Sequence, residues 1–117
     1  MTVTLYGIPN CDTVKKARTW LESKGIAYAF HDFKKAGLTP SLVDGWLKQV
    51  DWEVLVNRKG TTWRGLPDER KAAVADASSA AALMLESPSV IKRPVLVCND
   101  TTHVGFSDAG YQQIFNK

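Results

Sequence analysis

Hydrophobic positions near the N-terminus change from an alternating to a helical spacing. Residues 2–6 alternate threonine with apolar side chains and run into turn-forming residues, which predicts a strand and then a loop. From Cys11 the apolar side chains recur at helical spacing, with Asn10 as the expected N-cap and Gly25 as the expected end of the helix. Residues 26–33 are again β-prone. Strand, helix and strand in this order form a βαβ unit, whose two strands we expect to be parallel.

The middle of the chain, about residues 38–88, has helical patterns and lacks the composition of strands. Thr39 followed by Pro40 is typical of an N-cap and the first helical position. Further helices are expected to open near Pro67 and to cover residues 79–86. This part of the chain is therefore predicted to be a helical insert.

The C-terminal part returns to strand patterns and ends in a helix. Residues 95–98 form a short apolar strand, residues 103–106 are its expected hairpin partner, and Ser107 with Asp108 is expected to cap the last helix. The whole order is then β-α-β, helical insert, β-β-α. A thioredoxin-like fold has this order, so we predict an α/β chain with a mixed four-stranded sheet.

The size and composition of the chain fit one soluble domain. The 117 residues contain 44% hydrophobic and 23% charged residues, so we expect a single domain over 1–117 that is a monomer by default. The longest apolar run, residues 80–85, is six residues long. A membrane-spanning helix needs about 18, so no membrane span is expected. The N-terminus lacks the pattern of a signal peptide, which favours a cytoplasmic location.

The positive charge is small and evenly distributed. The net charge is +3, with eight Lys/Arg against six Asp/Glu in residues 1–58 and seven against six in residues 59–117. Neither half is a basic tail, and helix-turn-helix and zinc-finger signatures are absent. We therefore expect no nucleic acid partner. A small anionic ligand fits this charge better.

The two cysteines have different surroundings in the sequence. Cys11 and Cys98 are 87 positions apart, which suits neither a disulfide framework nor a metal site, so no metal is expected. Cys11 follows a strand and a loop at the start of a helix, where free N–H groups and the helix dipole favour a thiolate. Lys15, one turn further on, is expected to lower its pKa as well. The alternative is that Cys11 packs as a small hydrophobic side chain.

The residues after Cys11 bear on the mechanism. Val14 occupies the position where a dithiol oxidoreductase has its resolving cysteine, so no local disulfide can form. Cys98 ends an apolar strand and is predicted to be an inert buried thiol. An external small thiol is therefore favoured as the resolving group. His31 and His103 are isolated in the sequence and are predicted to be structural, unless one of them lies within hydrogen-bond reach of Cys11.

Three segments together resemble a known family. They are LYGIPNCDTVKKA over residues 5–17, RKGTTWR over residues 58–64 and IKRPVL over residues 91–96. In this order they resemble the arsenate reductase (ArsC)/Spx family, and within it the bacterial YffB group. The resemblance covers essentially the whole chain. It implies a thioredoxin-like fold with a helical insert.

The resemblance also implies the chemistry and the site. It makes Cys11 the catalytic residue and glutathione the electron donor and co-substrate. The oxyanion-binding arginines of arsenate reductases correspond to Arg58 and Arg93, and Pro94 corresponds to a cis proline beside the active cysteine. We expect Asn10, Arg58, Arg93 and Pro94 to form the binding site for glutathione or for a glutathionylated substrate.

One position departs from the arsenate reductase pattern. Where those enzymes have a third arginine on the last hairpin, this chain has Phe106, which puts arsenate reduction in doubt. We therefore predict a glutathione-dependent thiol–disulfide reductase that uses the single nucleophile Cys11. Two alternatives stay open. One is a glutathione-dependent arsenate reductase, and the other is a non-enzymatic, Spx-like regulator that binds RNA polymerase, although Val14 removes the Cys-x-x-Cys switch common in Spx.

Overall fold

The computed structural model describes residues 2–117. Their contacts divide into two compact units. The first unit contains the described residues up to Ala36 together with Arg93–Lys117, and the second is Gly37–Lys92. That the whole chain behaves as the one domain expected from its length stays a prediction.

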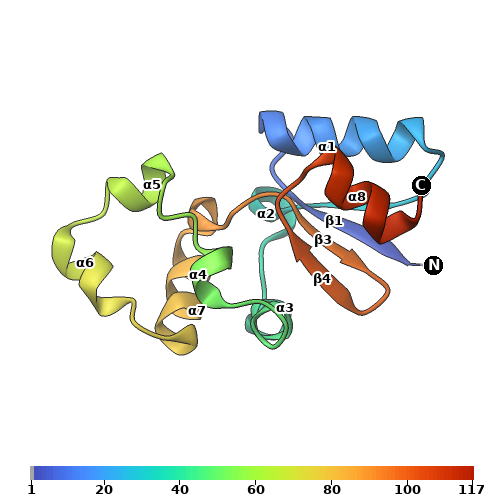
Figure 1. The fold of residues 1–117 in the computed structure, drawn as a ribbon. Helices are drawn as coiled ribbons and strands as arrows, with labels where there is room; N and C mark the ends of the chain where they lie inside the picture. Colours follow the sequence, from blue (N-terminus) through green and yellow to red (C-terminus); the bar gives the residue numbers. More distant parts are fainter. Residues whose placement is uncertain (1) are drawn as a thin grey trace. The chain divides into compact units, whose positions relative to one another are not determined.

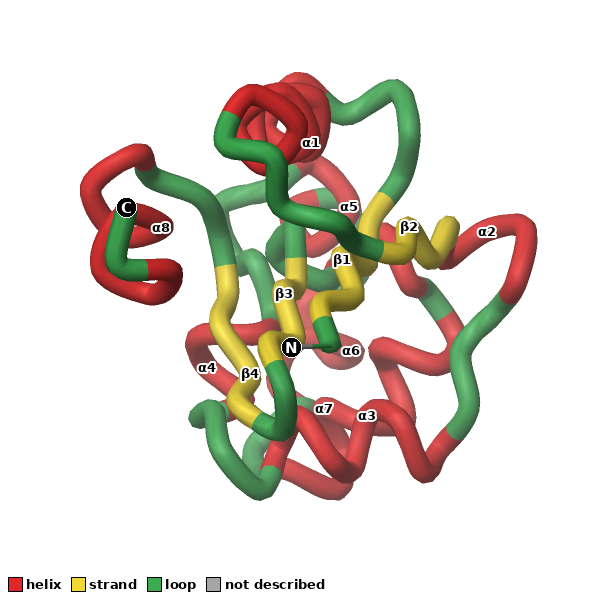
Figure 2. The backbone as a smooth tube through the Cα atoms, turned by 90° about the vertical axis from the view of Figure 1, so that its right-hand side faces the viewer, coloured by secondary structure: helices red, strands yellow, loops and turns green. Residues whose placement is uncertain are grey.

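The first unit is built on a four-stranded sheet (Figures 1 and 2). Its strands are β1 (Val3–Gly7), β2 (Ala29–Asp32), β3 (Val95–Cys98) and β4 (Thr101–Val104). The strand order is β2-β1-β3-β4, with β1 and β2 parallel and the other two pairs antiparallel. The predicted mixed sheet of a thioredoxin-like fold is therefore confirmed. The hairpin strand lies two residues earlier than the predicted 103–106, because Asn99 turns the chain with a positive φ and Thr101 already pairs with Cys98.

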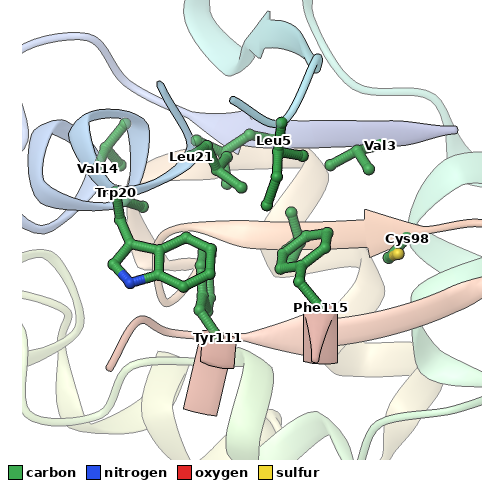
Figure 3. Close-up of a cluster of buried hydrophobic side chains, with 11 residues drawn as sticks. Val3, Leu5, Val14, Trp20, Leu21, Cys98, Tyr111 and Phe115 are labelled. Carbon is green, nitrogen blue, oxygen red and sulfur yellow. The ribbon is translucent and has the colours of Figure 1, made fainter. Parts of the chain in front are cut away.

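Three helices complete the first unit: α1 (Asp12–Ser23), α2 (Phe33–Ala36) and α8 (Asp108–Phe115). Alternate side chains of β1 and β3 point to one face of the sheet, and α1 and α8 cover that face. Figure 3 shows the resulting core, in which the Trp20 ring meets the Tyr111 ring edge-on at 5.5 Å between centroids. Aromatic pairs of this kind add about 0.5–1.5 kcal/mol to the hydrophobic burial. The core holds α1, and with it the preceding residue Cys11, against the sheet.

The chain around α1 differs from the sequence prediction at two points. The N-cap is Cys11 and not Asn10: Cys11 has extended backbone angles, and its carbonyl accepts a hydrogen bond from the Lys15 N–H at 2.9 Å. Strand β2 is shorter than the predicted run 26–33 at both ends. At its start the Ile26 N–H still donates to the Leu21 carbonyl of α1, and at its end the Asp32 carboxylate accepts hydrogen bonds from the N–H groups of Lys34 and Lys35 and starts α2. An aspartate in this position favours a turn over a continued strand.

The second unit is helical, as predicted for the middle of the chain. Its α-helices are α3 (Pro40–Leu47), α4 (Trp52–Leu55), α5 (Thr61–Arg64), α6 (Asp68–Ala73) and α7 (Ala77–Glu86), followed by the 3-10 helix η1 (Pro88–Val90). The predicted Thr39 cap is confirmed, since its hydroxyl accepts a hydrogen bond from the Leu42 N–H at 3.2 Å. The β-type pairing among residues 37–92 is one isolated bridge between Val56 and Ile91.

Over residues 2–117, none of the helices combines the length and the apolar character needed to cross a bilayer.

Candidate active site around Cys11

Cys11 lies where the chain turns from β1 into α1. Its N–H donates a hydrogen bond to the Ile8 carbonyl at 3.2 Å, which closes the turn, and its side chain is partly exposed. Gly7 ends β1 in close contact with α1, because a Cβ atom at this position would lie 2.7 Å from Cγ2 of the buried Val14. A glycine is therefore needed at position 7 for α1 to start this close to the strand.

The surroundings of the Cys11 sulfur favour its ionised form. Burial, the largest single influence, raises the pKa of the thiol. Hydrogen bonds from the backbone N–H of Val14, the Arg93 side chain and the Thr13 N–H, together with the positive charge of Arg93, lower it and outweigh burial. The net result is a pKa below the ordinary value for a cysteine. The cation that acts here is Arg93, whereas the sequence led us to expect Lys15.

Arg93 reaches Cys11 because of the sheet topology. Strands β1 and β3 are antiparallel neighbours, and Tyr6 near the end of β1 pairs with Val95 at the start of β3. Residues just before β3 therefore lie at the same end of the sheet as the turn that carries Cys11. The peptide bond between Arg93 and Pro94 is cis, as the family resemblance implies. Of the predicted site residues, Cys11, Arg93 and Pro94 thus share one end of the sheet.

Asn10 and Arg58 have other local settings. Asn10 is exposed in the turn directly before Cys11. Arg58 belongs to the second unit, where its guanidinium donates to the Glu53 carboxylate at 3.0 Å and lies 5.7 Å from the centre of the Trp52 ring. The predicted contributions of both residues to ligand binding stay predictions.

Cys98 lies at the opposite end of the same sheet. It is the last residue of β3 and pairs with Val3, the first residue of β1, so the lengths of both strands separate it from the turn of Cys11. At about 3.3 Å per residue, three steps along β3 already amount to about 10 Å. Only 8% of Cys98 is exposed, and Figure 3 shows it in the core beside Val3. The prediction that Cys98 is a buried, packed thiol is confirmed.

The two histidines have identifiable structural surroundings. His31 on β2 packs its ring against Tyr6, with 5.0 Å between the centroids. His103 lies on β4 opposite Leu96, and burial lowers the pKa of its imidazole. The groups that shift the pKa of Cys11 are Arg93 and the residues of the first turn of α1, and neither histidine is among them.

Phe106 follows β4 and belongs to the border of the core. Its ring meets that of Tyr111 edge-on at 4.7 Å, and its side chain packs against the cluster that also contacts Cys11. The position that the sequence compares with a third arginine is thus an aromatic contact. It brings no charge to this end of the unit.

One link near the site has no counterpart in the sequence prediction. The indole N–H of Trp20 on α1 donates a hydrogen bond to the Asp108 carboxylate at 2.7 Å. This bond joins α1 to the first turn of α8, 88 positions away in the chain. The sequence gives only the helical periodicity of Trp20 and the capping position of Asp108, so it offers no signal for the bond between them.

A family model agrees with this description. Residues 6–114 match the model described as "ArsC family". Among curated proteins, an "Uncharacterized protein" of Haemophilus influenzae is 39% identical over 113 residues, which are 97% of this chain and 98% of that protein. A "Global transcriptional regulator Spx" of Staphylococcus aureus is 24% identical over 91% of this chain and 81% of the regulator.

Two solved structures are similar to the chain over nearly its whole length. One is described as "YFFB (PA3664) PROTEIN", with a TM-score of 0.91, 46% identity, and coverage of 96% of this chain and 97% of that one. The other is an arsenate reductase (ArsC) related protein from Brucella melitensis, with a TM-score of 0.78, 53% identity, and coverage of 100% and 97%.

Proposed function

Because the chain belongs to the ArsC family, we propose that it is a glutathione-dependent thiol–disulfide reductase whose single nucleophile is Cys11. The observation that carries the proposal is the setting of the Cys11 sulfur. It is partly exposed and receives hydrogen bonds from two backbone N–H groups and from Arg93, which lower its pKa. A thiolate present at neutral pH is the form that attacks a disulfide.

The proposed reaction has two exchange steps. The Cys11 thiolate attacks the glutathione sulfur of a mixed disulfide, a bond forms between the two sulfurs, and the substrate leaves as a thiolate that takes a proton from water. A glutathione thiolate then attacks the same glutathione sulfur and releases the Cys11 thiolate with oxidised glutathione. The same N–H groups and Arg93 stabilise Cys11 as nucleophile and as leaving group.

An external thiol is required because the chain offers no second cysteine at the site. Val14, three residues after Cys11, is fully buried against Gly7, and Cys98 lies at the other end of the sheet. Glutathione is the external thiol that we propose. Arg93 would bind one of its carboxylates, with Arg58, Asn10 and Pro94 contributing to the same site.

Arsenate reduction is the second enzymatic candidate. Arg93 beside the Cys11 sulfur provides part of what an oxyanion needs. Phe106 stands at the position of the third arginine and packs on Tyr111, so fewer guanidinium groups are available for a tetrahedral anion. A coupled assay with arsenate and glutathione tests this candidate, and turnover comparable to that with a mixed disulfide would support it.

A binding role without catalysis is the third candidate. The likeness to Spx regulators over most of the chain is the observation that favours it. A pull-down from a bacterial extract tests it directly. Stoichiometric RNA polymerase subunits, combined with no thiol exchange at Cys11, would replace our proposal with the regulator.

The experiment for the reductase is intact-mass measurement after incubation with oxidised glutathione. The parent protein is expected to gain one glutathione, and a following addition of reduced glutathione should remove it. Cys11→Ser should gain none, while Cys98→Ala should behave like the parent. Glutathione on Cys11→Ser but not on Cys98→Ala would show that the proposed nucleophile is wrong.

A further inference from the structure

An open groove of about 440 Å³ runs along α1 within the first unit. Side chains of α1 from Lys15 to Ser23 line one side of it, and Phe106 and Asp108 line the other. The reaction steps proposed above do not use this groove.

The groove begins one helical turn from the nucleophile. Cys11, Lys15, Thr19 and Ser23 follow one another at four-residue intervals, so each lies one turn further along α1. The distance from Lys15 to Ser23 is about 12 Å at 1.5 Å per residue. Three or four residues of an extended peptide cover that length, at about 3.3–3.6 Å each. The groove is thus long enough for a peptide segment.

The groove combines an aromatic floor with a positively charged edge. Trp20 and Phe106 both contact the buried Tyr111 ring, which fixes them in place. Lys15 and Lys16 are exposed along the edge, and the ion pairs found within residues 2–117 involve neither of them.

The one acidic side chain of the groove is already engaged. The Asp108 carboxylate accepts hydrogen bonds from the Trp20 indole N–H at 2.7 Å and from the Gln112 side-chain amide at 3.0 Å. It is therefore held on the α8 side by its two donors. The positive charges of Lys15 and Lys16 therefore remain available to a ligand. A ligand that complements the whole groove carries an acidic group next to an apolar one.

We propose that the groove binds the peptide segment next to the glutathionylated cysteine of a protein substrate. An apolar or aromatic side chain of this segment would lie on Trp20 and Phe106, and an acidic side chain beside Lys15 and Lys16. This inference rests on the proposed reductase function and names its substrate class. The chemical step is the exchange described above, with the substrate protein's thiolate as the leaving group.

The test compares glutathionylated peptides that differ only beside their cysteine. One peptide carries Glu-Phe, a second Lys-Phe and a third Glu-Gly, and each kcat/KM is measured with reduced glutathione. Two screened ion contacts of about 0.5 kcal/mol each predict a preference of about fivefold for Glu-Phe over Lys-Phe. Added salt should reduce this preference. Glu-Gly should fall below Glu-Phe because it loses the aromatic contact.

The variant Lys16→Glu supplies the matched control for charge. It should lower the ratio of Glu-Phe to Lys-Phe turnover to one or below, while Lys48→Glu, the same charge change on the second unit, should leave the ratio as in the parent. Phe106→Ser should reduce the difference between Glu-Phe and Glu-Gly. Circular dichroism of each variant shows whether it is folded.

A small substrate separates the two proposals. Turnover of the cysteine–glutathione mixed disulfide reports on Cys11 chemistry alone. Equal turnover of all peptides, or identical preferences in Lys16→Glu and Lys48→Glu, would overturn the groove proposal while the reductase stands. Absence of turnover with the small disulfide as well would overturn the reductase itself. The protein could also prove to be a dimer that Lys16→Glu dissociates without any change in the peptide preferences. That result would overturn the peptide proposal and assign the groove to a second copy of the chain.

Discussion

The two cysteines of the first unit lie at opposite ends of its sheet and have different surroundings. At one end, Cys11 begins a helix, is partly exposed and receives hydrogen bonds from two N–H groups and an arginine. At the other end, Cys98 finishes β3 with 8% of its surface exposed and packs beside Val3. Both thiols contact the same hydrophobic core. The exposure and the polar surroundings of a thiol in this unit therefore differ with the end of the strands that it occupies, although both thiols contact the same core.

Replacing each thiol is the strongest way to test this comparison. Cys11→Ser is expected to lower mixed-disulfide turnover about a thousandfold or more, since removal of an attacking group usually costs at least this much. Cys98→Ala should keep turnover within about twofold and lower the free energy of unfolding by about 1 kcal/mol, because it removes a small buried group. Steady-state kinetics and urea unfolding measure the two effects. A large loss of turnover in Cys98→Ala would mean that the two ends are not independent.

The close contact behind Cys11 can be tested through Gly7. Gly7→Ala places a methyl group 2.7 Å from Cγ2 of Val14, so it should lower the free energy of unfolding by about 1–3 kcal/mol and displace the start of α1. Gly45→Ala is the matched control, because nothing lies within 4 Å of its added Cβ and alanine favours the helix it occupies. Urea unfolding of both variants gives the comparison. Equal free energies of unfolding for the parent and Gly7→Ala would show that α1 moves away from the added methyl group without loss of stability.

The arginine beside the sulfur should control the pH dependence of Cys11. Arg93→Ala removes a hydrogen bond and a positive charge that lower the pKa, so the pKa is expected to rise. Alkylation by iodoacetamide should then slow below neutral pH, and the parent and variant rates should converge at high pH where both thiols are ionised. Arg93→Lys keeps the charge and should retain part of the effect, while Lys92→Ala, at an exposed neighbour, should retain all of it. If the alkylation rates of Arg93→Ala and the parent depend on pH in the same way, Arg93 does not lower the pKa of Cys11.

The smallest expected effect is the contribution of Cys11 ionisation to the free energy of unfolding. Its pKa is lowered in the folded state, so ionisation stabilises the fold at high pH, and this contribution is lost as pH falls through the lowered pKa. We compare the free energy of unfolding of the reduced parent with that of Cys11→Ser. The difference should increase as the pH rises from the lowered pKa to the ordinary value of 9.0, and it should stay constant at higher pH. Urea unfolding of both proteins at pH 6 and pH 9.5 measures the difference. A difference independent of pH would mean that the thiolate is not stabilised.

Local signals in the sequence predict most of the first unit correctly. The Ser107 cap is confirmed, since its hydroxyl accepts a hydrogen bond from the Gly110 N–H at 3.0 Å, and the apolar run 95–98 is β3. Capping and short apolar runs depend on neighbouring residues, which a single sequence contains. The Asn10 cap is wrong because Asn10 and Cys11 both precede the helical pattern, and the backbone stays extended through Cys11 before α1 starts at Asp12.

The site needs contacts that the local pattern does not contain. Arg93 reaches Cys11 only because β3 runs antiparallel to β1, and the sequence points to this arginine through the family resemblance alone. The groove between α1 and Phe106 depends on how two distant segments pack on one core. Neither periodicity nor charge along the chain indicates such an arrangement.

The bond between Trp20 and Asp108 also gives the first unit a spectroscopic probe. Of the four tryptophans in the chain, Trp20 belongs to the first unit, whereas Trp46, Trp52 and Trp63 belong to the second. With those three changed to phenylalanine, the remaining fluorescence comes from an indole that donates to a carboxylate at 2.7 Å and lines the groove. Occupation of the groove, or loosening of α1 from α8, would then change the emission of a single fluorophore.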